Sequence, residues 1–213
     1  MNDKKLISFD LDGTLVDPEF NEWVWGYGIP ELYAVTHGID FQRAKECVIR
    51  EYNRIGDGSI EWYDIGYWFK LLGLNGNSKE LMLKFKNKIR VYPEVPRVLD
   101  NLNRKYDLIV TSNAAREFLE MELTSMGLGH YFKQTFSATS DFKQVKKTPE
   151  FYERVCKLME VRPCEVIHVG DHWEFDYLTP SKLGMCCFFI DRHGHSQGEF
   201  VIRDLKDLEQ RIR

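Results

Sequence analysis

Two carboxylates that are one residue apart, Asp10 and Asp12, follow a short apolar run near the start of the sequence. The run at 6–9 is too short for most helices and predicts a buried strand, and Gly13 predicts a tight turn after it. Side chains alternate along an extended chain, so both carboxylates face the same side and can act on one reacting group. A carboxylate nucleophile beside an acid/base carboxyl suits a two-step transfer, because each step then needs only a modest proton movement.

A second predicted strand ends in small polar residues. The apolar run at 108–110 predicts the strand, and Thr111, Ser112 and Asn113 follow it directly. In an open parallel sheet ligands bind beyond the carboxyl ends of the strands, so we expect this end and that of the first strand to face the same crevice. A hydroxyl and the backbone N–H groups near a helix start bind phosphate oxygens, and the same residues can also cap the helix that follows.

Further carboxylates follow another apolar run, at 166–169. Asp171 comes after Gly170, which permits a close backbone approach, and Asp176 follows five residues later. Several carboxylates at one site repel each other strongly unless a cation holds them together. A hard divalent ion with oxygen ligands accounts for such a cluster, and Mg²⁺ is the cofactor that we expect.

These motifs, in this order, resemble those of the haloacid dehalogenase superfamily, in particular its phosphatase branch with a helical cap, of the phosphoglycolate phosphatase type. The resemblance covers the core from residue 5 to residue 190. It implies that Asp10 attacks phosphorus and becomes a transient aspartyl-phosphate, and that Asp12 protonates the leaving oxygen and then activates water. It also implies that Ser112 binds the substrate phosphate, with Asn113 beside it, and Thr111, one residue earlier, is the alternative to Ser112.

The resembled family has a lysine just before a helix that begins with proline, where the ammonium neutralises the nucleophile and the transferring phosphoryl group. In this sequence Pro149 begins such a helix, which puts Lys146 in the lysine position and Lys147 where proline is common. We therefore prefer Lys146 as the phosphate-binding lysine, with Lys147 as the alternative. Alternatively, either lysine is an exposed loop residue without a role in function.

The resemblance also implies a set of metal ligands. They are Asp10, the backbone carbonyl of Asp12 and Asp171, with Asp176 assisting directly or through water. A dedicated zinc site is not expected, because the histidine pairs at positions 168/172 and 193/195 carry no closed ligand set.

The spacing of apolar residues divides the chain into two parts. From residue 17 to residue 92 apolar residues recur at helical spacing and aromatic residues are dense, so we expect 17–92 to be an inserted α-helical cap domain. Outside it strands and helices alternate, which predicts an α/β fold with a doubly wound, Rossmann-like parallel sheet in a catalytic core of 1–16 and 93–213.

Within the predicted cap, helices are expected after Asp40, which can act as an N-cap, from Ser59, and over 78–90. The aromatic side chains of this segment are expected to form mainly the core of a helix bundle. Those that closely follow the first boundary, such as Trp25, could instead overhang the active site and select substrate by shape.

Composition excludes several classes of protein. The 213 residues are 43% hydrophobic and 29% charged, as in an ordinary globular protein. The net charge of −4, without a gathered basic stretch, argues against a nucleic-acid partner. No segment has the length of a membrane span and no signal peptide is visible, so we expect no membrane association and a cytoplasmic location. The five cysteines include no Cys-x-x-Cys pair, which argues against a disulfide framework.

The sequence thus predicts a magnesium-dependent phosphate monoester hydrolase that acts on a small phosphorylated metabolite. A sugar phosphomutase on the same fold is an alternative, as are a non-catalytic, partner-binding member and a protein in which phosphorylated Asp10 is a stable signal. Sugar phosphates, phosphoglycolate and nucleotides are all candidate substrates, because cap residues choose among them and carry no readable motif. A helical cap can dimerise or simply cover the site, so both a monomer and a homodimer stay open.

Overall fold

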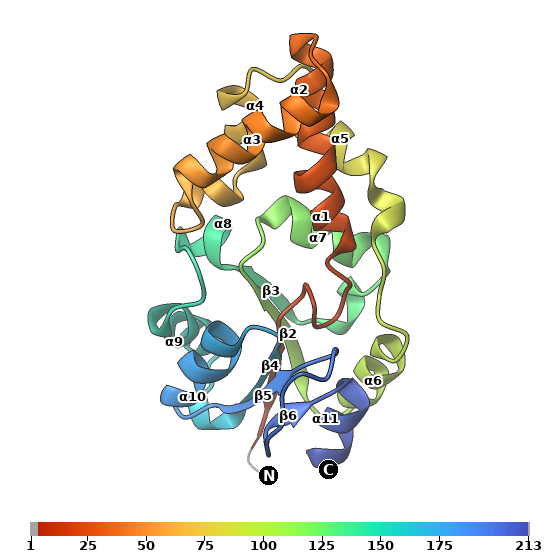
Figure 1. The fold of residues 1–213 in the computed structure, drawn as a ribbon. Coiled ribbons are helices and arrows are strands. Elements are labelled where there is room, and N and C mark those ends of the chain that lie inside the picture. The colour runs from red at the N-terminus through yellow and green to blue at the C-terminus, as the bar shows by residue number, and fades with distance from the viewer. Residues whose placement is uncertain (1–3, 213) are drawn as a thin grey trace. The chain divides into compact units, whose positions relative to one another are not determined.

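The computed structural model describes residues 4–212, which divide into two compact units (Figure 1). The core unit comprises the residues up to 17 and those from 91 onward, and the helical unit comprises residues 18–90. The bounds of the helical unit differ by only one or two residues from those of the 17–92 segment that the change in apolar spacing indicates.

A six-stranded sheet forms the centre of the core unit. Its strands are β1 (Leu6–Phe9), β2 (Asp107–Ser112), β3 (Gln134–Ser137), β4 (Val166–Gly170), β5 (Cys186–Ile190) and β6 (Val201–Ile202). Their order is β3-β2-β1-β4-β5-β6 and every neighbouring pair is parallel, which confirms the predicted doubly wound α/β sheet. The chain starts in the middle of the sheet and extends first to one side and then to the other, so a crevice is expected at the carboxyl end of β1.

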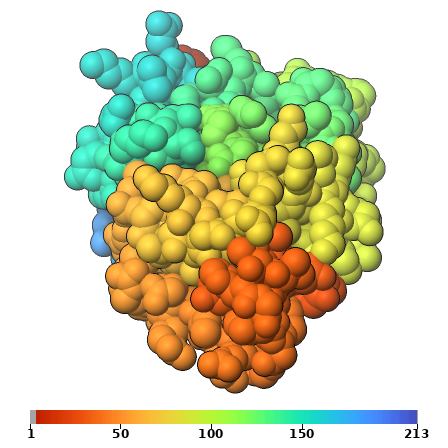
Figure 2. Space-filling view, turned by 90° about the horizontal axis from the view of Figure 1, so that it is seen from above, coloured from red at the N-terminus to blue at the C-terminus, as the bar shows by residue number. Residues whose placement is uncertain are grey.

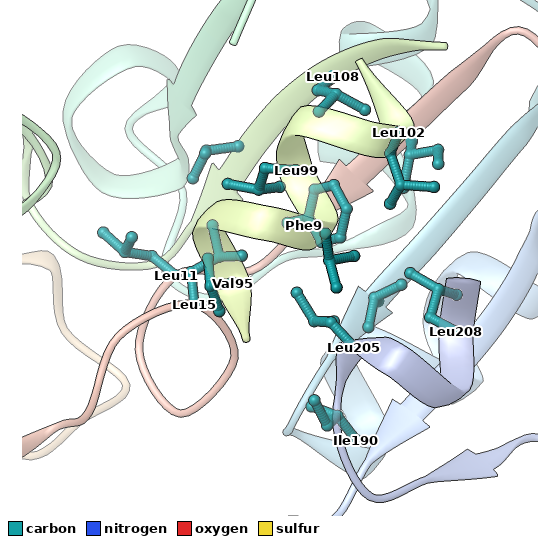
Figure 3. Close-up of a cluster of buried hydrophobic side chains, with 14 of the residues drawn as sticks. Phe9, Leu11, Leu15, Val95, Leu99, Leu102, Leu108, Ile190, Leu205 and Leu208 are labelled. Atoms are coloured by element: carbon teal, nitrogen blue, oxygen red, sulfur yellow. The ribbon is translucent and has the colours of Figure 1, made fainter. Parts of the chain in front are cut away.

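Helices cover both faces of this sheet. They are α6 (Val95–Leu102), α7 (Arg116–Ser125), α8 (Ala138–Phe142), α9 (Pro149–Leu158), α10 (Thr179–Lys182) and α11 (Leu205–Arg211). On one face α6, α7 and α11 pack on alternate strand residues, and Figure 3 shows Leu99 and Leu205 beside Phe9. On the other face α8 and α9 pack around Leu6 and Ile109. Burial on both faces explains why the strands read as continuous apolar runs in the sequence.

The register of β1 brings the polar strand ends together. Phe9, the last residue of β1, pairs with Val110 of β2 and with Val169 of β4. Asp10 follows Phe9, and its N–H donates a hydrogen bond to the carbonyl of Val169 at 2.8 Å. The first carboxylate therefore leaves the sheet between the ends of two neighbouring strands.

The helical unit contains no strand among its residues, all of which the structure describes. Its helices are α1 (Glu19–Trp23), α2 (Ile29–His37), α3 (Phe41–Ile55), α4 (Ile65–Leu71) and α5 (Ser78–Lys84). Asp40 caps α3 as expected, since its carboxylate accepts a hydrogen bond from the N–H of Arg43 at 3.0 Å. Figure 2 shows the orange surface of α2 and α3 next to the yellow surface of the segment that contains α4 and α5.

Two helices of this unit are shorter than predicted. The segment from Ser59 begins with the 3₁₀ turn Ile60–Tyr63, and α4 starts only after Asp64, whose carboxylate accepts a backbone N–H three residues later at 3.0 Å. The helix predicted over 78–90 ends at Lys84. Asp64 offers the backbone a side-chain partner, so a new helix begins where the sequence suggested a continuous one.

Aromatic rings form much of the interior of the helical unit. Trp68 is fully buried, and Tyr52 packs edge-on against it with ring centroids 4.6 Å apart. Trp23 stacks on Phe85 at 5.8 Å, and the ammonium of Lys88 lies 4.2 Å from the centroid of the Trp23 ring. These contacts are those of a helix-bundle core.

The two ends of the core unit that lead to the helical unit lie side by side. Val16 and Val91 form an antiparallel bridge, and the N–H of Tyr92 donates to the carbonyl of Leu15 at 3.2 Å. The chain thus leaves the core unit and returns to it at neighbouring positions.

All five cysteines are free. Among the helices of residues 4–212, none combines the length and the apolar character that crossing a membrane requires.

Candidate active site

Asp10 is the first residue after β1, and its side chain is buried. Burial raises the pKa of Asp10 well above its usual range, the ammonium of Lys147 lowers it, and neighbouring carboxylates such as that of Asp176 raise it again. An anionic Asp10 therefore depends on the cations that face it.

Lys147 supplies such a cation from the loop before α9. Its side chain is 1% exposed, and its ammonium donates to Oδ1 of Asp10 at 2.6 Å and to the carbonyl of Thr111 at 3.3 Å. The same ammonium forms an ion pair with Asp176. Burial alone would lower the pKa of Lys147, but the charges of Asp10 and Asp176 outweigh burial and hold this pKa above its usual range. Lys147 is thus a fixed positive charge between two carboxylates.

Lys146, which the spacing to proline favours, lies elsewhere. Its ammonium is 5.4 Å from the centroid of the Phe175 ring, and its backbone has a left-handed φ of 72°. This conformation, which is uncommon outside glycine, turns the chain so that the next residue points into the core unit. We therefore replace Lys146 by Lys147 as the proposed phosphate-binding lysine.

Asp10, Asp171 and Asp176 form an acidic cluster in which one oxygen from each side chain lies within 4.8 Å of the others. Desolvation and the carboxylate of Asp176 raise the pKa of Asp171 to about 6. Burial also acts against ionised Asp176, but the ammonium of Lys147 and a hydrogen bond from His168 hold the pKa of Asp176 below its usual range. Three carboxylate oxygens near one point are a donor set that fits a hard divalent ion such as Mg²⁺.

Two glycines allow these carboxylates to approach the backbone closely. A Cβ on Gly13, whose φ is +72°, would overlap the carboxylate of Asp171, and a Cβ on Gly170 would overlap that of Asp176. The carboxylate of Asp171 thus lies against the loop that also carries the backbone carbonyl of Asp12. This contact is compatible with that carbonyl as the further metal ligand that the resemblance implies.

Behind the cluster, a buried hydrogen-bond network joins three elements. Oγ of Ser8 contacts Oγ1 of Thr111 at 2.8 Å and Nδ1 of His168 at 3.0 Å. Nε2 of His168 contacts Oδ1 of Asp176 at 3.0 Å and the hydroxyl of Tyr152 at 3.1 Å. No sequence motif marks Ser8 or Tyr152, although a serine inside a buried apolar run is itself a signal of a specific partner.

Ser112 is the last residue of β2, and Asn113 follows it in the turn that leads to α7. Oγ of Ser112 accepts a hydrogen bond from the N–H of Ala114 at 3.0 Å, and the carbonyl of Asn113 accepts one from the hydroxyl of Thr139 at 3.2 Å. Oδ1 of Asn113 is buried and has no hydrogen-bond partner within residues 4–212. A turn held in this way keeps a hydroxyl and an amide at the carboxyl end of β2, where a phosphate oxygen can be bound.

Asp12 has a partner that the sequence did not suggest. Its side chain forms a hydrogen bond with Glu122, a fully buried residue of α7. In the sequence Glu122 is one of several glutamates in a helical stretch, so only its apolar neighbours at 118, 119 and 123 hint that it faces inward.

Arg192 fixes the loop that follows Asp12. Its guanidinium donates to the carbonyls of Gly13 at 3.1 Å and Thr14 at 2.5 Å, and to Oε1 of Glu94 at 2.9 Å. It also lies 3.5 Å from the centroid of the Tyr92 ring. This arginine follows β5 and holds backbone groups next to the two aspartates, a role that no motif predicts.

The chain is similar to several known proteins. The family profile described as haloacid dehalogenase-like hydrolase matches residues 4–184. GMP/IMP nucleotidase YrfG of Escherichia coli is 32% identical over 73 residues, so the match spans only about a third of each protein, 34% of this chain and 32% of that one. Phosphoglycolate phosphatase of Vibrio vulnificus is 26% identical over 230 residues, which cover 96% of this chain and 90% of the relative. A crystal structure of an HAD phosphatase from Thermococcus onnurineus superposes with a TM-score of 0.85 at 25% identity and covers 98% of this chain and 97% of its own.

Proposed function

The chain belongs to the haloacid dehalogenase-like hydrolases, and from this premise we propose that it is a magnesium-dependent phosphatase that hydrolyses a phosphate monoester of a small metabolite through an aspartyl-phosphate. The observation that carries the proposal is the buried ion pair of Asp10 and Lys147 beside the acidic cluster. A carboxylate nucleophile, a fixed cation and a metal site together suit phosphoryl transfer. The similarity to a phosphoglycolate phosphatase supports a small phosphorylated substrate.

In the first step, a carboxylate oxygen of Asp10 forms a bond to phosphorus, and the bond between phosphorus and the ester oxygen breaks. Asp12 gives its proton to the departing oxygen, which leaves as an alcohol. Lys147 and Ser112 bind phosphoryl oxygens, with Asn113 beside them. Because the ammonium of Lys147 is already fixed by its carboxylate partners, little reorganisation is needed when charge moves onto the phosphoryl group.

In the second step, water attacks the phosphorus of the aspartyl-phosphate. Asp12, now a carboxylate, accepts a proton from this water, and the bond between phosphorus and Asp10 breaks. Inorganic phosphate leaves and both aspartates return to their starting states. One residue thus serves as acid in the first step and as base in the second.

We assign the metal to Asp10, the backbone carbonyl of Asp12 and Asp171, with Asp176 assisting directly or through water. When bound, Mg²⁺ supplies positive charge that stabilises the phosphoryl oxygens during in-line transfer. The ammonium of Lys147 favours the ionised forms of Asp10 and Asp176, and carboxylate oxygens are the ligands that Mg²⁺ prefers.

We further propose that the helical unit acts as a cap that selects the substrate, and that the protein works in the cytoplasm as a monomer or homodimer. The net charge of −4 supports a small-molecule substrate over nucleic acid.

The experiment that tests the proposal is phosphate release from p-nitrophenyl phosphate and a panel of phosphate esters, including phosphoglycolate, a sugar phosphate and GMP, with and without Mg²⁺. We expect release that requires Mg²⁺ and that falls by more than about 1,000-fold in Asp10→Asn, because the covalent step is lost. Asp100→Asn, on the surface of α6, is the matched control and should behave as the wild type.

Two outcomes would contradict the proposal. Transfer of phosphate between positions of a sugar phosphate without net release would identify a phosphomutase. No release from any ester, together with a partner that co-purifies, would identify a binding protein that keeps the fold.

A further inference from the structure

Glu122 is an unusual residue for the buried face of a helix. The other buried residues of α7 are Phe118, Leu119 and Leu123, which pack in the core unit, and Glu122 shares their face with 0% of its surface exposed. Packing alone would favour another apolar side chain at this position. A carboxyl group here needs a reason other than the hydrophobic core.

The carboxyl group of Glu122 forms a hydrogen bond with that of Asp12. Two carboxyl groups can form a hydrogen bond only if they share at least one proton between them.

We propose that Glu122 is a positioning residue for Asp12, whose carboxyl group it orients toward the leaving group and water. This inference rests on the proposed function, because it gives Asp12 the acid and base role stated above. Asp12 lies in a loop, whereas Glu122 is on a helix whose backbone is fixed. A hydrogen bond to such a partner limits the orientations that the catalytic carboxyl can adopt.

The position of α7 gives this contact a further consequence. The turn with Ser112 and Asn113 leads directly into α7, so the phosphate-binding turn and Glu122 belong to one continuous segment. The segment that binds the phosphoryl oxygens therefore also orients the group that protonates the leaving oxygen. A shift of α7 would disturb both together.

A purely structural role makes a different prediction. A buried carboxyl group that only packs should be replaceable by an apolar side chain of similar length, with equal effects on all substrates. A positioning role predicts a selective loss, because only a poor leaving group needs the proton of Asp12. The structural cost of a buried carboxyl also predicts that its removal does not lower the temperature of unfolding.

The test compares Glu122→Met, which removes the hydrogen bond, with Glu122→Gln, whose amide still donates one to Asp12. The exposed Glu120→Met on the same helix is the control. For each, kcat/KM is measured with 2,4-dinitrophenyl phosphate, whose leaving group needs no proton, and with the alkyl phosphate of the panel that the wild type cleaves best. For Glu122→Met we expect kcat/KM to fall by at least about 10-fold with the alkyl ester and by less than about 3-fold with the dinitrophenyl ester. Glu122→Gln should keep most of the wild-type kcat/KM with each ester, and the control Glu120→Met should keep all of it.

Equal losses with the two esters, or no loss with either, would overturn the inference while leaving the proposed function intact. In an Asp12→Asn background Glu122→Met should have no further effect, and a full additional loss would contradict a role through Asp12. If neither Glu122→Met nor Glu122→Leu folds, Glu122 serves the stability of α7 and the inference is wrong. No release by the wild type from any ester would refute the proposed function itself, and the inference with it.

Discussion

The ammonium of Lys147 lies 2.6 Å from Oδ1 of Asp10, and both side chains are buried at the carboxyl end of β1. The same ammonium pairs with Asp176, so one cation serves two carboxylates that would otherwise repel each other. Removing one member of a buried ion pair leaves its partner uncompensated, which costs far more than losing a surface pair. This arrangement makes Lys147 important for the stability of the site and, under the proposed function, for its chemistry.

The two adjacent lysines should therefore respond very differently to the same substitution. We expect Lys147→Met to reduce kcat for p-nitrophenyl phosphate by about 100-fold or more, and to lower the free energy of unfolding by about 3–5 kcal/mol. Lys146→Met removes an ammonium that lies over the Phe175 ring. Its kcat for p-nitrophenyl phosphate should stay within about 3-fold of the wild type, because a cation–π contact at a partly exposed site is weak. Circular dichroism shows whether each variant is folded before its activity is compared. Comparable losses in both variants would contradict the assignment of Lys147.

Binding of Mg²⁺ should raise the temperature of unfolding, because the ion binds the folded acidic cluster and not the unfolded chain. A concentration about 100 times the dissociation constant adds about 2.7 kcal/mol to the free energy of unfolding. We expect Asp171→Asn to remove most of the shift in a thermal unfolding experiment, and Asp100→Asn to retain it. A shift that survives in Asp171→Asn would show that the ion binds elsewhere.

Gly13 offers a test of close packing at the same site. Gly13→Ala combines a left-handed backbone with an overlap against the carboxylate of Asp171. Gly127→Ala is the matched control, because Gly127 has a similar φ of +65° but open space around a Cβ. The free energy of unfolding should fall by about 1–2 kcal/mol in both variants, because alanine is strained in the left-handed backbone conformation. Only Gly13→Ala should also weaken the Mg²⁺-dependent shift in unfolding temperature and the rate of phosphate release, and equal effects on activity would argue against this packing.

Glu165, far from the active site, makes the stability of the fold sensitive to acid. A hydrogen bond from Lys5 and others from the backbone and side chain of Arg162 hold the pKa of Glu165 at about 2. In the unfolded chain this pKa is about 4.3, so between these values the unfolded state binds more protons than the folded state. The stabilisation is fully present above about pH 4.3 and is lost as the pH falls toward 2.

Glu165→Gln should accordingly lower the temperature of unfolding more at pH 6 than at pH 3. The exposed Glu153→Gln is the control and should give no difference that depends on pH in this way. A gap between wild type and Glu165→Gln that stays constant from pH 6 to pH 3 would contradict the role of this carboxylate.

The sequence was sufficient for the sheet and for the polar residues that end three of its strands. Buried parallel strands form apolar runs that stop abruptly, and the stops at Asp10, Ser112 and Asp171 mark the carboxyl edge directly. Because these strands are neighbours in the sheet, the residues that follow them converge without further information.

What the sequence could not supply depends on local backbone geometry and on distant contacts. The choice between Lys146 and Lys147 turns on a left-handed residue that is not glycine, which no propensity predicts. Glu122 lies 110 positions from Asp12, in a helix whose other glutamates, Glu117 and Glu120, are exposed. The break before α4 depends on the side chain of Asp64, which accepts a hydrogen bond from a backbone N–H and so begins a new helix.

The bridge between Val16 and Val91 makes the insertion topologically equivalent to the loop of a hairpin. Residues paired across an antiparallel bridge have Cα atoms about 5 Å apart, so a short turn could join them as well as the 73 residues of 18–90 do. Since the entropy of closing a loop grows only slowly with its length, the size of the insert places little thermodynamic demand on the sheet. Inserts of other lengths and folds could therefore replace residues 18–90 at this junction without altering the sheet or the residues at its carboxyl edge.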